Sequence, residues 1–144
     1  EYAQKYYQPQ AMFDFATLTG AVVDALGSTT TGIMGNNTSM IQRVRESATV
    51  TGERVWELPL YEEFEEDLKS SYADIKNIGT REAGASKAGT FLKFFVDKKV
   101  PWVHCDVAGS AYHRKDVNYH PKKYGAGVMV RLITHLIENW GPLK

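Results

Sequence analysis

Short apolar runs alternate with amphipathic stretches along the chain, and this alternation predicts strands separated by helices. Three runs of β-branched and aromatic residues have strand character, and they cover residues 11–17, 31–34 and 100–107. Apolar positions at helical spacing predict the helices. These cover residues 1–7 and 21–26, a stretch that begins at Thr38 or Ser39, and residues 61–69, 84–96 and 124–140. Strands separated by helices favour an α/β sandwich with a largely parallel sheet.

The two ends of the chain differ in character. Residues 1–7 have the pattern of a helix already under way, with no Met at the start, and this helix closes before Pro9. The last helix stops at Gly141 and Pro142, as natural helices commonly do. Three strands are too few for a complete sheet of this class. We therefore expect that an upstream part of the domain is absent from this chain.

Composition and charge exclude several classes of protein. Hydrophobic residues make up 43% of the 144 residues, and Lys+Arg 17 balance Asp+Glu 17, so there is no basic surface for nucleic acid. The single cysteine cannot form an internal disulfide, and no apolar stretch approaches the ~20 residues of a membrane span. The first ten residues do not resemble a signal peptide. We expect one domain, located in the cytosol or an organelle matrix, with no nucleic-acid or membrane partner.

The most informative polar segment follows the first predicted strand, at residues 17–20 (Thr-Leu-Thr-Gly). Ligands of parallel α/β sheets sit beyond the carboxyl ends of the strands. Thr19 offers a hydroxyl there, and Gly20 would let a ligand approach the backbone closely. The alternative is that Thr19 only caps the next helix and Gly20 only makes the turn. Asp14, inside the strand, is either a metal ligand or, as the stronger interpretation, a hydrogen-bonding group at the sheet edge.

A second segment places His104, Cys105 and Asp106 side by side in the third predicted strand. Alternate residues of a strand point to opposite faces, so adjacent residues do not share a site. We therefore expect Cys105 to be a small core residue. His104 and Asp106 share the other face, where they would form a metal pair or, more simply, a hydrogen-bonded structural couple.

Other polar clusters have simple structural interpretations. The acidic run at residues 62–67 covers the solvent face of a predicted helix. His113, Asp116 and His120 lie in a predicted loop, and their spacing matches no zinc motif. From the residues alone, the chain has a sheet-edge site but no complete nucleophile, metal cage or acid–base pair.

Five segments, taken together and in the same order, resemble the C-terminal part of the leucyl aminopeptidase family. The resemblance covers nearly the whole chain and implies the C-terminal portion of a three-layer αβα sandwich with a mostly parallel mixed sheet. Residues 1–144 would then be the C-terminal part of a catalytic domain. The five segments are DFATLTGAVVDALG (residues 14–27), GERVWELPL (52–60), YADIKNI (72–78), GASKAGTFLKFFV (84–96) and PWVHCDVAG (101–109).

The family consists of cytosolic, usually hexameric metallo-aminopeptidases, so the resemblance implies removal of N-terminal residues, often Leu, from peptides. Two divalent metals, Mn or Zn, would activate the water. Backbone groups of the 17–20 segment would align the peptide, and small residues after the last strand would line the pocket for its first side chain. The substrate-binding positions implied in this way are Thr17, Leu18, Thr19, Gly20, Ala108 and Ala111.

The chain also departs from the family pattern. The family's metal-binding Asp and Glu residues, its catalytic Lys and its catalytic Arg lie upstream, the last of them in an NTDAEGR-type motif. None of these positions exists here, so we expect no catalytic residue and no metal ligand in this segment, and no activity from the segment alone. Residues 123–128 read KYGAGV, where many members are closer to GATGFGV.

Three hypotheses follow. The chain is part of a metallo-aminopeptidase whose remaining part lies in the same polypeptide or a companion chain. Alternatively, it is a non-catalytic structural or assembly subunit derived from such an enzyme. A third hypothesis is a small ligand-binding α/β domain without peptidase ancestry.

Overall fold

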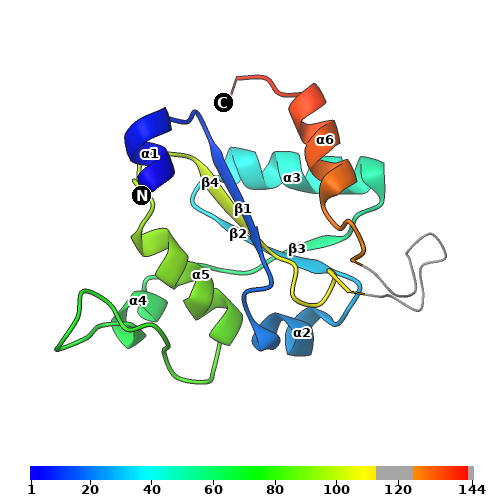
Figure 1. The fold of residues 1–144 in the computed structure, drawn as a ribbon. Coiled ribbons are helices and arrows are strands. Elements are labelled where there is room, and N and C mark those ends of the chain that lie inside the picture. Colours follow the sequence, from blue (N-terminus) through cyan, green and yellow to red (C-terminus); the bar gives the residue numbers. More distant parts are fainter. Residues whose placement is uncertain (113–124, 143–144) are drawn as a thin grey trace.

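A computed structural model describes residues 1–112 and 125–142, which contain a four-stranded sheet (Figure 1). The strands are β1 (Met12–Ala16), β2 (Thr31–Gly35), β3 (Val55–Glu57) and β4 (Trp102–Asp106), and their spatial order is β1-β4-β2-β3. Three of them were predicted. The sequence pattern missed β3, because this strand is short and two of its three residues are exposed, so it shows no apolar run.

The sheet is mixed but mostly parallel. β1 runs parallel to β4 and β2 runs parallel to β3, whereas β4 and β2 are antiparallel. The carboxyl ends of β1 and β4 therefore share one edge of the sheet with the amino end of β2. In the register, Ala16 pairs with Asp106 and Asp106 faces Gly32. The segments that follow β1 and β4 consequently begin side by side at this edge.

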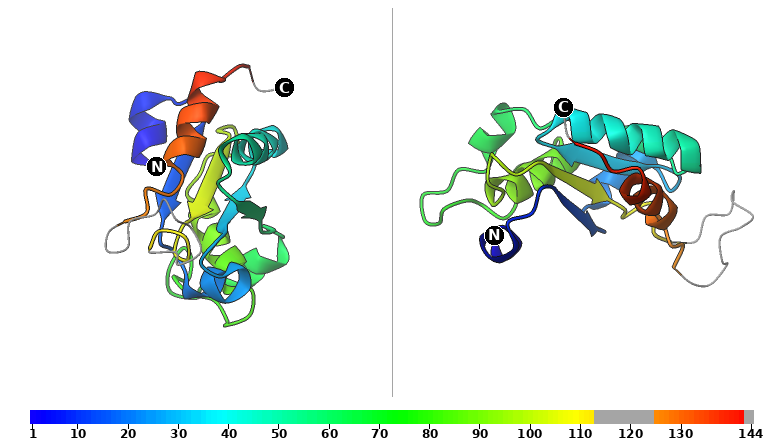
Figure 2. Two further views of the ribbon diagram at one scale, coloured as in Figure 1. Left: turned by 90° about the vertical axis from the view of Figure 1, so that its right-hand side faces the viewer. Right: turned by 90° about the horizontal axis from the view of Figure 1, so that it is seen from above.

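Helices cover both faces of the sheet, which confirms the predicted αβα sandwich (Figure 2). α3 (Thr38–Thr51) and α6 (Val130–Glu138) pack together on one face. The core on that side consists of apolar residues that alternate along the central strands and repeat at helical spacing on α3 and α6. It includes Ile33, Val103, Cys105, Val107, Met40, Ile41, Val44, Met129, Leu132 and Leu136.

The opposite face carries α2 (Gly20–Leu26) and α5 (Gly84–Phe94), with α4 (Glu63–Asp67) packed on α5. α5 lies so close to β2 that a Cβ on Gly89 would lie 2.5 Å from the sulfur of Met34. Small residues on α5 thus set the distance between this helix and the sheet.

α1 (Tyr2–Tyr7) ends before Pro9, as predicted, and it contacts the segment after α5. The side-chain amide of Gln4 donates to the carbonyl oxygen of Phe95 at 2.9 Å and accepts from the backbone N–H of Asp97 at 2.5 Å. None of the helices in the described residues is both long and apolar enough to cross a membrane.

Three details of the predicted helices were wrong. The cap of α3 is Asn37, whose side-chain oxygen accepts from the backbone N–H of Met40 at 2.9 Å, and neither Thr38 nor Ser39 is the capping residue. α4 is shorter than the predicted 61–69 helix: it begins after the exposed Tyr61 and ends just before Leu68, which is buried. The last helix, α6, is shorter than the predicted 124–140 helix, because residues 125–129 are not helical and α6 begins at Val130. Residue 124 itself lies outside the described residues.

Candidate functional site

The carboxylate of Asp106, at the end of β4, is the centre of the sheet edge that the sequence indicated. This residue is fully buried. One of its oxygens, Oδ1, accepts from the backbone N–H of Leu18 and of Ala108, both at 3.1 Å. The other oxygen, Oδ2, accepts from the hydroxyl of Thr19 at 2.8 Å. The side chain therefore ties together the segments that follow β1 and β4.

The 17–20 segment links β1 to α2. Its two interpretations, a ligand site at the sheet edge and a helix cap with a turn, are compatible. Thr19 has extended backbone geometry and caps α2, because its Oγ1 accepts from the backbone N–H of Val22 at 3.0 Å. Thr17 and Gly20 are exposed, and Leu18 is half-buried. A Cβ added to Gly20 would meet nothing within 4 Å. The segment is thus anchored by Thr19 and open to solvent at Thr17 and Gly20.

The 108–111 segment forms a turn beside it. The backbone N–H of Ala111 donates to the carbonyl oxygen of Val107 at 2.8 Å. The buried hydroxyl of Ser110 lies 2.7 Å from that of Thr31, at the start of β2. Ala108 and Ala111 are both half-buried. The structure therefore brings the six predicted site residues to one edge of the sheet.

Sequence reasoning did not identify Asp106 as the residue that joins the two segments. His104 and Asp106 were expected to form a couple, and this was wrong: no hydrogen bond links them among those found in the described residues. Residues two apart on a strand are about 6.6 Å apart along it, and each side chain finds a nearer partner on the β1 side. A strand that ends in Asp just before small residues (Asp106, Ala108, Gly109) is the signal that could have located the site.

His104 is instead paired with Asp14 on the adjacent strand β1. Its Nδ1 lies 2.5 Å from Oδ1 of Asp14, and the indole N–H of Trp102 donates to Oδ2 at 2.6 Å. His104 is fully buried, and its Nε2 has no hydrogen-bond partner among the described residues. Asp14 is therefore a hydrogen-bonding group of the sheet, as the stronger of its two interpretations predicted.

Cys105 is a core residue, as predicted. It is fully buried among the apolar residues under α3 and α6. Burial raises the pKa of its thiol well above the usual range, and the nearby Asp14 carboxylate raises this pKa further. A thiol with a raised pKa is a poor nucleophile, so the thiol is not part of the candidate site.

No group of three or more His, Cys, Asp or Glu side chains in the described parts of the chain could hold a metal ion. His113, Asp116 and His120 lie outside those parts. The acidic run on α4 is exposed, as predicted, apart from Asp67. The ammonium group of Lys87, a buried residue, lies 2.5 Å from Oδ2 of Asp67 and also contacts the hydroxyl of Thr80.

These contacts have an electrostatic consequence for Asp67. Its hydrogen bonds with Lys87 and with the backbone and side chain of Thr80 lower its pKa to about 2. The sequence pattern missed this cluster, because Lys87 lies within an otherwise small and apolar stretch of α5.

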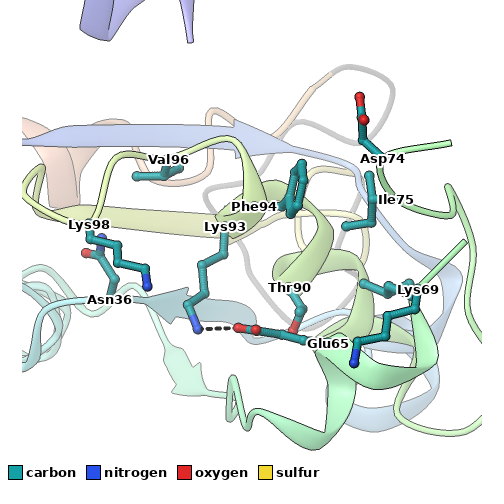
Figure 3. A pocket seen from close by; sticks show the side chains of 11 residues that line it. Asn36, Glu65, Lys69, Asp74, Ile75, Thr90, Lys93, Phe94, Val96 and Lys98 are labelled. Carbon is teal, nitrogen blue, oxygen red and sulfur yellow. Dashed lines mark hydrogen bonds and ion pairs between the residues drawn. The ribbon is translucent and has the colours of Figure 1, made fainter.

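A cavity of about 720 Å³ lies elsewhere, between α4, α5 and the loop after α4 (Figure 3). Its lining includes Asn36, directly after β2, and Lys98, shortly before β4, so it is at the opposite edge of the sheet from Asp106. Within it, the ammonium group of Lys93 donates to Oε1 of Glu65 at 3.0 Å. None of the predicted site residues lines this cavity.

Comparisons with known proteins agree with the α/β fold. The family model for the "Cytosol aminopeptidase family, catalytic domain" matches residues 1–134. A probable cytosol aminopeptidase of Chlamydia felis is 45% identical over 140 residues, which are 96% of this chain and 28% of the relative. One from a Sulfurihydrogenibium species is 48% identical over 128 residues, which are 88% of this chain and 25% of the relative.

A solved structure is also similar. It is a tomato leucine aminopeptidase with a lysine-to-glutamate substitution, which matches with a TM-score of 0.86 and 36% identity over 94% of this chain and 26% of the tomato chain. The chain thus spans about a quarter of the length of the relatives it matches.

Proposed function

Because the chain belongs to the cytosol aminopeptidase family, we propose that it forms the substrate-side wall of a metallo-aminopeptidase. The complete enzyme removes N-terminal residues from peptides, with Leu preferred. The relatives named as aminopeptidases support a peptidase over the alternative of a non-catalytic assembly subunit.

The observation that carries this proposal is the joining of the 17–20 and 108–111 segments by Asp106 at one partly exposed sheet edge. In the proposal, backbone groups of Leu18 and Gly20 align the peptide. The N–H of Leu18 already donates to Asp106, so contact with a peptide falls to its carbonyl oxygen. Gly20 is open to solvent, with room for a close approach.

The remaining site residues would surround the first side chain of the peptide. Thr17 is exposed beside the aligned backbone, whereas Ala108 and Ala111 lie in the adjacent turn. Methyl side chains leave space for an apolar group and offer it no polar partner. This arrangement supports a preference for an aliphatic N-terminal residue such as Leu.

The complete enzyme would use two divalent metal ions, Mn or Zn, to activate the attacking water. The described residues do not fit such a centre, because no group of three or more suitable side chains lies together in residues 1–112 and 125–142. We therefore propose that the metal ligands and the catalytic residues lie outside this segment, and we assign no catalytic step to it. A cytoplasmic location and a homohexamer are part of the same proposal.

The test is peptide hydrolysis by the natural polypeptide that contains these residues, purified and supplied with Mn or Zn. Release of free Leu from a peptide that begins with Leu, abolished by a chelator and restored by the metal, is the expected result. No release with either metal would contradict the proposed activity. Native mass spectrometry of the same sample, before and after denaturation, gives the mass of the assembly and of its chains.

The isolated 144-residue segment tests the proposed division of roles. It should release no Leu with any divalent metal. Chelator-sensitive release by this segment alone would contradict its assignment as a wall without metal ligands.

A further inference from the structure

No cation pairs with the buried carboxylate of Asp106 within residues 1–112 and 125–142. The ion pairs found among the described residues include none with this side chain, although it is fully buried. Burying a carboxylate is unfavourable unless hydrogen bonds compensate for the lost water. The three donors that the described part of the chain supplies belong to the residues that follow β1 and β4 (Leu18, Thr19 and Ala108).

These contacts connect two segments that are 88 residues apart in sequence. Two of the three donors are backbone N–H groups, so the carboxylate fixes main-chain positions in both segments. The third donor, the hydroxyl of Thr19, also caps α2 through Val22. A shift of the Asp106 side chain would therefore move the 17–20 and 108–111 segments relative to each other.

We propose that Asp106 is a positioning residue that sets the distance between the peptide-aligning backbone and the pocket for the first side chain. This inference rests on the proposed function. The carboxylate acts through Leu18, Thr19 and Ala108. Its effect should therefore reach both binding of the peptide and the choice of the N-terminal residue. Displacements of about 1 Å in such positioning groups can lower rates about 100-fold.

The test compares Asp106→Asn with the matched control Asp14→Asn in the natural polypeptide. Both replace a hydrogen-bonded carboxylate of the same sheet, but Asp14 contacts Trp102 and His104 and neither segment. In Asp106→Asn, the amide side chain would have one acceptor oxygen for three donors. We expect amide hydrogen exchange to accelerate in both segments of Asp106→Asn and to be unchanged there in Asp14→Asn. Acceleration in one segment only, or equally in the control, would overturn the proposal.

Kinetics give a second readout that simple destabilisation would not produce. A smaller fraction of folded enzyme lowers kcat equally for all substrates and leaves KM unchanged. We expect Asp106→Asn to raise KM, lower kcat/KM for a Leu peptide by about tenfold or more, and change the ratio of kcat/KM between N-terminal Leu and Ala. A change in kcat alone would contradict the inference, if KM and the Leu-to-Ala ratio of kcat/KM were the same as in Asp14→Asn.

Two further comparisons keep the test decisive. If Asp106→Asn does not fold, Thr19→Val removes only the Oδ2 contact and the cap, and Thr19→Ser keeps both. Faster exchange at residues 108–111, which Thr19 does not hydrogen-bond, is then expected in Thr19→Val only, and its absence would overturn the proposal. If the wild-type protein hydrolyses no peptide, the proposed function fails, while hydrogen exchange still decides whether Asp106 couples the two segments.

Discussion

Gly109 lies directly against the carbonyl oxygen of Gly27, so closely that a Cβ on Gly109 would overlap that oxygen. Gly27 ends α2 with a φ of 67°, which lets the chain turn toward β2. Gly109 belongs to the 108–111 segment. The contact therefore joins the end of α2, the helix that Thr19 caps, to the turn after β4.

Substitution of Gly109 by Ala should destabilise the protein, because the clash is with backbone and no side chain can move aside. Overpacking of this kind typically costs about 1–3 kcal/mol. Thermal unfolding of the natural polypeptide measures the effect. Gly125→Ala is the control, since a Cβ there meets nothing within 4 Å. Equal unfolding midpoints for the two variants would show that the Gly27 contact is not tight in solution.

Gly20→Ala should lower kcat/KM without changing the stability of the protein. A Cβ at Gly20 meets nothing within 4 Å, so we expect the free energy of unfolding to stay within about 0.5 kcal/mol of the wild type. The methyl group would stand where a peptide backbone is proposed to approach, so kcat/KM for Leu peptides should fall about tenfold or more. Unchanged kinetics beside unchanged stability would exclude Gly20 from the substrate site. Gly125→Ala again serves as the control.

Lys87→Met should destabilise the protein in a pH-dependent manner. The contacts with Lys87 and Thr80 lower the pKa of Asp67 from 3.8 to about 2. A lowered carboxyl pKa stabilises the fold above the unfolded-state pKa, and this stabilisation is lost as the pH falls through the folded-state pKa. The difference in urea midpoint between wild type and Lys87→Met should therefore be full above about pH 5 and shrink between about pH 4 and pH 2.

The control for Lys87 is Lys69→Met. Lys69 pairs with Glu66 at 2.6 Å, but both side chains are more than two-thirds exposed, and such surface pairs contribute little. The urea midpoint of this variant should equal that of the wild type over the whole pH range. A midpoint difference for Lys87→Met that does not change with pH would mean that the Asp67 charge is not what Lys87 stabilises.

Cys105 should be unreactive in the folded protein. It is fully buried, and its thiol pKa is raised by burial first and by Asp14 second. N-ethylmaleimide at pH 8 should therefore modify the peptide that contains Cys105 only after denaturation, as peptide mass spectrometry can show. Rapid modification of this cysteine under native conditions would contradict its placement in the core.

The sequence by itself determined the layers of this protein. Helical and strand periodicity are local properties, so they located three of the four strands and placed Cys105 on the core face. Five ordered segments were enough to indicate the family. The pattern also placed the 17–20 segment at an edge of the sheet, because it follows a strand, whereas Ala108 and Ala111 were implied by the family resemblance.

Only the tertiary structure decided the partners of the polar side chains. Asp106 accepts a hydrogen bond from Leu18, 88 positions away in the sequence, while its near neighbour His104 pairs with Asp14. The pairing of Lys87 with Asp67 likewise depends on the packing of α4 against α5. Periodicity states which face a side chain occupies, but a hydrogen bond depends on which groups the fold brings within about 3 Å. For Asp106 and His104, that distance is set by the register of β1 with β4.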